Sequence, residues 1–168
     1  MGVADIILGI KIVRDGHNLG LSPSHYIEKI LKNFDEFEGY SVSTPFDPSI
    51  KFVPNTGSSV SQIEYAKIIG CLIYALTCTR PDIVYVVGCL SRYTDNSSKD
   101  HWHAVRRILK YLKGTINYIL LYSGEPSILE GYTDASWINY TEDHASTSGW
   151  IFTLGGGAIF WDPRNKLA

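Results

Sequence analysis

The sequence predicts an α+β fold in which a β-hairpin and a small helical bundle are followed by a β-rich segment. Three observations support this class. A hairpin signal stands near the start, apolar residues repeat at helical spacing through the middle, and the spacing changes to that of strands from Tyr118. The 168 residues suffice for one ordinary domain or two small pieces. We expect two segments, residues 1–117 and 118–168.

The first expected element is the β-hairpin. Residues 6–13 are mostly apolar, Asp15-Gly16 is a turn signal, and Leu19-Gly20-Leu21 supplies the second arm. A helix from Pro23 to Phe34 should follow. Ser22 is a favoured N-cap residue for it, and proline suits a first helical position.

Residues 39–62 differ from both neighbours. They are rich in proline, glycine, serine and threonine, which favours an extended linker on the surface. A helical block is expected from about residue 61 to 113. Pro81 ends its first helix and begins the second, and the third runs from about Asp100 to Leu112, with Gly114 ending it.

Short strands are expected in the last third of the chain. Their predicted ranges are 118–122, 128–133, 147–153 and 158–161. The last two are separated by Gly155-Gly156-Gly157, which is typical of a hairpin turn. Together these strands predict an antiparallel sheet.

Composition excludes several classes of protein. The formal net charge of −2 does not indicate a generally basic nucleic-acid-binding protein, so such a role must depend on a local patch. The three cysteines lie in apolar runs without a CxxC pair and are expected to be free thiols. We find no signal peptide and no apolar run long enough for a membrane helix, which favours the cytoplasm or nucleus and no membrane partner.

One basic stripe lies on the third helix of the block. Arg106, Lys110 and Lys113 share a face, at positions i, i+4 and i+7, and Arg107 lies beside them. Such a stripe can follow a phosphate backbone. It is equally the pattern of a solvated helix face with cations near the helix C-terminus. The residues alone leave both interpretations open.

Asp134 is the most plausible metal-binding residue. It follows the apolar run that ends in Tyr132-Thr133 and precedes small residues, where a carboxylate can bind Mg²⁺. A turn-capping role explains the same pattern. Glu142 and Asp143 fall in a polar loop, and two-metal sites need several carboxylates, so Asp134 alone cannot complete one. No phosphate-binding loop or nucleophile signature is present.

Several phrases in a fixed order resemble the Pol polyproteins of copia-type (Ty1/copia) retrotransposons. The resemblance spans nearly the whole chain, and the ordered spacing makes it specific although single phrases are weak. The phrases are Leu8-Gly9-Ile10-Lys11-Ile12, Leu21-Ser22-Pro23-Ser24-His25-Tyr26-Ile27, Val42-Ser43-Thr44-Pro45, Tyr65-Ala66-Lys67-Ile68-Ile69-Gly70, Thr79-Arg80-Pro81-Asp82-Ile83, Tyr111-Leu112-Lys113-Gly114-Thr115, Gly131-Tyr132-Thr133-Asp134-Ala135-Ser136-Trp137, Ser146-Thr147-Ser148-Gly149 and Gly156-Gly157-Ala158-Ile159-Phe160-Trp161.

The resemblance implies a division into two parts. Residues 1–117 would be the end of a reverse transcriptase palm with thumb or connection helices, and residues 118–168 the first strands of a ribonuclease H-like domain. It favours nucleic-acid binding by Arg106, Arg107, Lys110 and Lys113, with template–primer or RNA–DNA hybrid and the rest of Pol as partners. It also matches Asp134 to the first metal-binding carboxylate of ribonuclease H, with Mg²⁺ as cofactor.

Departures from the family pattern limit what the chain is expected to do. The polymerase Tyr-x-Asp-Asp phrase and the later ribonuclease H carboxylates are absent from the sequence, and Ser136 stands where these elements often carry a second Asp. We therefore expect nucleic-acid binding without catalysis. Two alternatives remain: a Mg²⁺-dependent ribonuclease H completed by carboxylates from elsewhere, and a non-catalytic interaction module. The incomplete sheet predicts an open edge and marginal stability.

Overall fold

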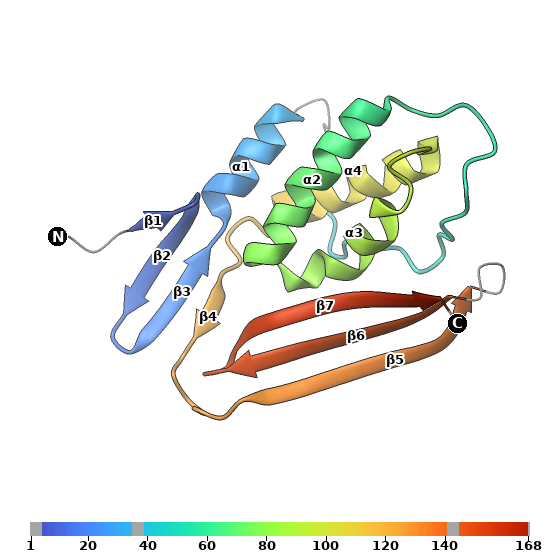
Figure 1. Ribbon diagram of the computed structural model, residues 1–168. Helices are drawn as coiled ribbons and strands as arrows, with labels where there is room; N and C mark the ends of the chain where they lie inside the picture. Colours follow the sequence, from blue (N-terminus) through green and yellow to red (C-terminus); the bar gives the residue numbers. More distant parts are fainter. Residues whose placement is uncertain (1–4, 35–38, 141–144, 168) are drawn as a thin grey trace. The chain divides into compact units, whose positions relative to one another are not determined.

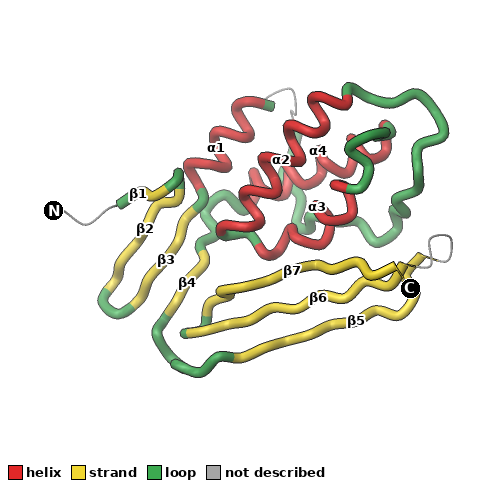
Figure 2. Tube along the Cα trace, in the orientation of Figure 1, coloured by secondary structure: helices red, strands yellow, loops and turns green. Residues whose placement is uncertain are grey.

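The computed structural model describes residues 5–34, 39–140 and 145–167 (Figure 1). It confirms the α+β class, with four α-helices and two antiparallel sheets in the described residues. Figure 2 shows the helices confined to the middle of the chain, with strands before and after them. The chain divides into two compact units. Unit 1 comprises Met1–Ile12 and Ser22–Ile119, and unit 2 comprises Val13–Leu21 and Leu120–Ala168.

The predicted hairpin is present, formed by β2 (Ile10–Asp15) and β3 (Asn18–Ser22). A separate short strand, β1 (Ile6–Ile7), pairs antiparallel with the start of β2. Leu8 and Gly9 between them have positive φ angles of 52° and 80°, so the chain reverses there. The expectation of one continuous arm over residues 6–13 was therefore wrong, because Gly9 permits a tight turn.

The helices follow the predicted periodicity closely. They are α1 (Ser24–Asn33), α2 (Gln62–Cys78), the 3₁₀ turn η1 (Pro81–Ile83), α3 (Val84–Ser91) and α4 (Lys99–Gly114). Pro81 begins a 3₁₀ turn rather than the α-helix itself, and α4 extends through Gly114 to a C-cap at Thr115.

The core of unit 1 is made by the inward faces of these four helices. Among its side chains, Tyr65, Leu72, Ile83, Val105 and Ile108 are fully buried. This cluster agrees with the expectation that apolar residues repeat at helical spacing through the middle of the chain.

Residues 39–61, which we call the strap, were expected to be a surface linker. Apolar strap residues instead pack against the helical core: Phe52 is 5% exposed, and Val42, Phe46, Ile50 and Val60 are partly buried. The segment is irregular and mostly exposed, as expected, but its composition did not reveal that these apolar residues anchor it to the core.

The strap runs antiparallel to α4. Ser41 lies beside Gly114, Thr44 is bonded to Arg107, and the Phe52 ring lies 6.0 Å from that of His101. Further along, the Val60 N–H donates to the Ser97 carbonyl at 3.0 Å, just before α4 begins. The strap thus covers the length of this helix.

Unit 2 holds β4 (Leu120–Tyr122), which pairs with β3, and a three-stranded meander. The meander consists of β5 (Glu130–Tyr140), β6 (Ala145–Leu154) and β7 (Gly157–Leu167), in that order. The turn between β6 and β7 has Gly155 and Gly156 at φ of 59° and 77°, as the glycine run predicted. β5, β6 and β7 continue past the predicted ends of their strands, whereas β4 and β5 each begin two residues later than predicted.

Candidate nucleic-acid interface

The helix α4 is positioned by its buried face and by its N-terminal cap. Ala104, Val105, Ile108, Leu109 and Leu112 lie in the core. The Ser98 hydroxyl accepts from the His101 N–H at 3.2 Å, and the Ser98 N–H donates to His101 Nδ1 at 3.0 Å. This reciprocal cap satisfies two backbone donors at the helix start.

The four predicted cations lie on the outer side of α4 and differ in exposure. Lys113 is exposed, whereas Arg106, Arg107 and Lys110 are half-buried. Arg106, Lys110 and Lys113 occupy neighbouring turns on one face, as their spacing required. We call these three residues the outer basic face.

Arg107 is engaged by the strap. Its Nε donates to the Thr44 carbonyl at 3.2 Å, one terminal nitrogen donates to the Thr44 hydroxyl at 2.9 Å, and the other lies 3.7 Å from the Asp47 carboxylate. All three guanidinium nitrogens therefore have partners in the strap. The sequence had not indicated this role.

Asp47 is itself held in place by a local turn. Its Oδ1 accepts from the Ser49 hydroxyl at 2.7 Å and from the Ser49 N–H at 3.0 Å. These two hydrogen bonds lower the pKa of Asp47, with a smaller contribution from the charge of Arg107. The carboxylate is therefore ionised and fixed where it faces Arg107.

Lys110 lies against the start of the strap. A Cβ placed on Gly39 would come within 3.1 Å of Lys110 Nζ and Cε. Within the described parts of the chain, neither Lys110 nor Lys113 has a hydrogen bond or ion pair.

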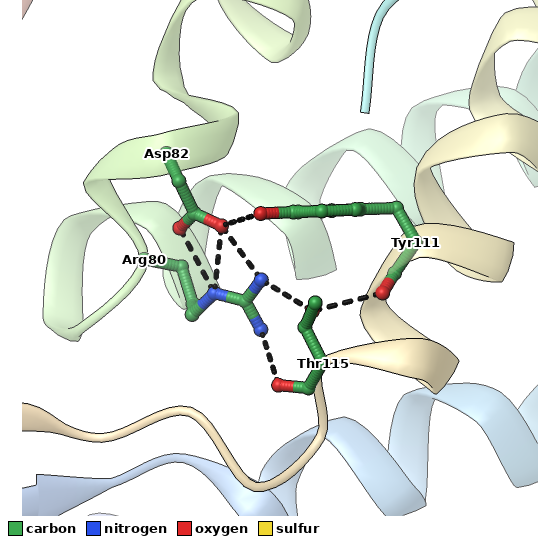
Figure 3. A network of polar contacts seen from close by, with 4 residues as sticks. All are labelled: Arg80, Asp82, Tyr111 and Thr115. Atoms are coloured by element: carbon green, nitrogen blue, oxygen red, sulfur yellow. Dashed lines mark hydrogen bonds and ion pairs between the residues drawn. The ribbon is translucent and has the colours of Figure 1, made fainter. Parts of the chain in front are cut away.

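A polar network of unit 1 joins η1 to the end of α4 (Figure 3). Arg80 is 2% exposed and donates from Nε and from a terminal nitrogen to the Asp82 carboxylate, at 2.9 and 2.7 Å. It also donates to the Thr115 hydroxyl at 2.7 Å and to the Thr115 carbonyl at 3.3 Å. The Tyr111 hydroxyl donates to Asp82 at 2.7 Å.

This network joins the Thr79-Arg80-Pro81-Asp82-Ile83 and Tyr111-Leu112-Lys113-Gly114-Thr115 phrases in space. Burial alone would raise the pKa of Asp82, but the hydrogen bonds and charge of Arg80 and the bond from Tyr111 outweigh burial and hold it below its usual range. Burial and the Asp82 contact raise the pKa of Tyr111 to about 12. Because Arg80 is buried and fully paired, it belongs to the framework that orients α4 and is not available to a ligand.

Sequence reasoning missed this network. Arg80 and Asp82 were interpreted only as the break between two helices, and Tyr111 only as part of a phrase. The available signal was an Arg and an Asp two residues apart between strongly apolar helices, since charged residues in such a place are usually paired.

Asp134 lies in the middle of β5, opposite Gly149 of β6, and is exposed. The expectation that it ends a strand was wrong, because β5 continues to Tyr140. By the alternation of strand residues, Tyr132 shares its face. Asp162 pairs with Trp150 and so lies on the opposite face.

The described residues do not fit a Mg²⁺ site at Asp134. No group of three or more His, Cys, Asp or Glu side chains that could hold a metal exists among them. Glu142 and Asp143 lie outside the described residues. No described helix is both long and apolar enough to cross a membrane.

Comparison with known proteins gives clear relatives. The chain is 40% identical over 173 residues to the retrovirus-related Pol polyprotein from transposon TNT 1-94 of Nicotiana tabacum, which covers 98% of this chain and 13% of that protein. It is 37% identical over 161 residues to the corresponding polyprotein from transposon RE2 of Arabidopsis thaliana, covering 95% of this chain and 11% of that protein.

A shorter relative is Secreted RxLR effector protein 161 of Plasmopara viticola, which is 36% identical over 108 residues, or 64% of this chain and 76% of that protein. No protein-family model matches the chain, and no solved structure does. The chain thus spans only a small part of the length of the two polyproteins. The ordered phrases and these identities over almost the whole chain show that it belongs to the retrovirus-related Pol polyproteins of copia-type retrotransposons.

Proposed function

We propose that this chain is the segment of Pol in which the reverse transcriptase ends and a ribonuclease H-like domain begins, and that it binds template–primer or RNA–DNA hybrid without catalysing a reaction by itself. Residues 1–117 would be the reverse transcriptase part and residues 118–168 the ribonuclease H-like part. The rest of the polyprotein would be its partner in the parent element. The relatives are Pol polyproteins, which supports this assignment.

The observation that carries the binding proposal is the outer basic face of α4. Lys110 and Lys113 carry charges without protein partners in the described residues, on a chain whose net charge is −2. The face is fixed by the capped helix and its buried opposite side. A positioned row of cations attracts a phosphate backbone and releases counterions on binding, so affinity should fall steeply with salt.

The donor set around Asp134 supports the expectation that the chain does not catalyse a reaction by itself. A single exposed carboxylate cannot hold the paired metal ions of a nuclease. A Mg²⁺-dependent ribonuclease H remains an alternative function if carboxylates from another chain or from further sequence complete the site. A third candidate function is a purely structural module. Binding that weakens with salt would distinguish our proposal from it.

The test measures binding and cleavage of a labelled RNA–DNA hybrid by the full chain. We expect salt-dependent binding in the absence of metal and no cleavage with Mg²⁺ or Mn²⁺. Lys110→Ala combined with Lys113→Ala should weaken binding and reduce the slope of log K against log salt by about 2, since each phosphate contact contributes about 0.9. Lys67→Ala, an exposed cation on α2, is the matched control.

Two outcomes would change this assignment. Binding that is absent, or independent of salt, would favour the structural module. Cleavage that disappears in Asp134→Asn would favour the ribonuclease alternative.

A further inference from the structure

We infer that Arg107 is a positioning residue of the α4 interface: it clamps the strap beside the outer basic face and does not itself contact phosphate. This inference rests on the proposed nucleic-acid binding and assigns one of its four cations a different role.

The clamp uses the whole guanidinium group. The contacts to the Thr44 carbonyl and hydroxyl approach from two nitrogens, at 3.2 and 2.9 Å, and Asp47 faces the third at 3.7 Å. This planar fork geometry is specific to arginine, because a lysine ammonium cannot reach all three acceptors in fixed directions. A phosphate could bind Arg107 only by displacing strap groups.

The clamp lies in the first half of the strap, between Gly39 and Ile50. From Phe52 onward the strap is tied by Tyr93, whose hydroxyl donates to the Phe52 carbonyl at 3.0 Å, and by the amides of Asn55 and Asn96. Between Gly39 and Ile50, Arg107 donates two hydrogen bonds from α4 to the strap. Loss of Arg107 should therefore loosen this first half of the strap, which Val42, Phe46 and Ile50 would still hold by apolar contact.

The first half of the strap also supports the outer basic face. Gly39 lies against the end of the Lys110 side chain, and Ser41 lies against Gly114 at the end of α4. Release of the strap would remove the surface on which Lys110 rests, although its charge would remain. Arg107 would thus affect affinity by ordering a neighbouring cation, which lowers the conformational entropy lost on binding.

The first measurement tests, without nucleic acid, whether Arg107 holds the strap against α4. Lys51 is the single Lys or Arg between residues 39 and 61, so tryptic cleavage after it reports release of the strap. We expect Arg107→Ala to speed this cleavage about tenfold, as local opening becomes more frequent. Arg107→Lys should speed it as well, whereas Lys67→Ala should not. An unchanged cleavage rate in Arg107→Ala would overturn the clamp.

The second measurement separates positioning from phosphate contact. Asp47→Asn removes a negative charge beside the interface while keeping an acceptor for Ser49. If Arg107 contacts phosphate, this substitution should tighten binding of the RNA–DNA hybrid. If Arg107 positions the strap, it should weaken binding by about twofold to fivefold, because an interaction that orders Lys110 is lost. Thr44→Val should act in the same direction.

The salt dependence provides the third distinction. Arg107→Ala should raise Kd severalfold with the slope of log K against log salt unchanged, whereas Lys113→Ala should reduce that slope by about 0.9. Restoration of wild-type affinity by Arg107→Lys, or a slope reduced in Arg107→Ala, would overturn the inference. Failure of the wild-type chain to bind any hybrid would overturn the proposed function. The rate of tryptic cleavage after Lys51 would still show whether Arg107 holds the strap.

Discussion

At the scale of single residues, two buried polar groups matter most for the candidate interface. Arg80 links η1 to Thr115 at the C-cap of α4, and His101 caps the other end of the same helix. His101 is 1% exposed and its ring is stacked on Tyr93, with centroids 4.0 Å apart. Both ends of α4 are therefore held by side chains that cannot easily be replaced.

Removal of the Asp82 carboxylate should strongly destabilise unit 1. Asp82→Ala leaves the buried guanidinium of Arg80 without its counterion. Because the Asp82 side chain is 33% exposed, the loss should be about 2 to 3 kcal/mol, less than for a fully buried pair. Tyr111→Phe removes only one hydrogen bond to Asp82 and should cost about 1 kcal/mol. Urea unfolding followed by tryptophan fluorescence measures both; equal losses would contradict this ranking.

His101 should make stability depend on pH. Burial lowers its pKa below the ordinary value of 6.5 in the folded chain. The unfolded chain therefore binds a proton first as pH falls, so this contribution is complete above pH 6.5 and is lost as pH decreases through the folded pKa. Unfolding free energies between pH 5 and 8 should decrease toward pH 5. His101→Gln should remove that dependence, and an unchanged slope would exclude His101 as its source.

At the scale of elements, close approach of strands in unit 2 explains the glycine that follows the β6–β7 turn. A Cβ on Gly157 would lie 2.5 Å from the Tyr122 ring and 2.6 Å from the Leu121 carbonyl oxygen of β4. The carbonyl belongs to a backbone and cannot rotate away. The Tyr122 hydroxyl donates to the Ala158 carbonyl at 2.7 Å, which fixes β4 beside β7.

Gly157→Ala should accordingly destabilise unit 2 by about 1 to 3 kcal/mol, the usual cost of overpacking a close contact. Gly149→Ala on β6 is the matched control, because nothing lies within 4 Å of its added Cβ. Thermal unfolding of the two variants measures the difference. A Gly157→Ala variant as stable as Gly149→Ala would show that β4 can move away from β7.

At the scale of the whole molecule, the two units differ in how much apolar surface they bury. Unit 1 contains a cluster of fully buried helix side chains. Among the described side chains of unit 2, Ala158 is the single buried apolar residue, while Tyr132, Ile128, Leu129 and Phe160 are each more than half exposed. Such a sheet gains little from the hydrophobic effect by itself.

Unit 2 should therefore open more often than unit 1. We expect amide hydrogen exchange in β5, β6 and β7 to be at least about tenfold faster than in α2 and α4, because fewer buried contacts protect these strands. Hydrogen exchange read by mass spectrometry on the full chain measures each segment. Equal protection of the strands and helices would contradict the prediction of marginal stability for this part.

Much of this protein was determined by local sequence signals. Helical spacing predicted α1, α2 and α4, and the glycine run predicted the β6–β7 turn, because periodicity and turn chemistry depend on residues close in the chain. The ordered phrases likewise identified the family before the relatives confirmed it. The length of β5 and the chain reversal at Gly9 were harder to predict from the sequence, since pairing partners decide where strands begin and end.

Tertiary structure alone decided which charged groups are paired. Arg80 meets Thr115 across 35 positions, and Arg107 meets Thr44 across 63. The sequence assigns Arg107 and Lys110 the same candidate role, because both are cations on the outer side of one helix. Only the course of the strap removes Arg107 from the set available to a ligand and leaves Lys110 and Lys113 within it. The physical reason is that a charge is neutralised by whatever the folded chain brings within a few ångströms, and distance along the sequence does not determine that.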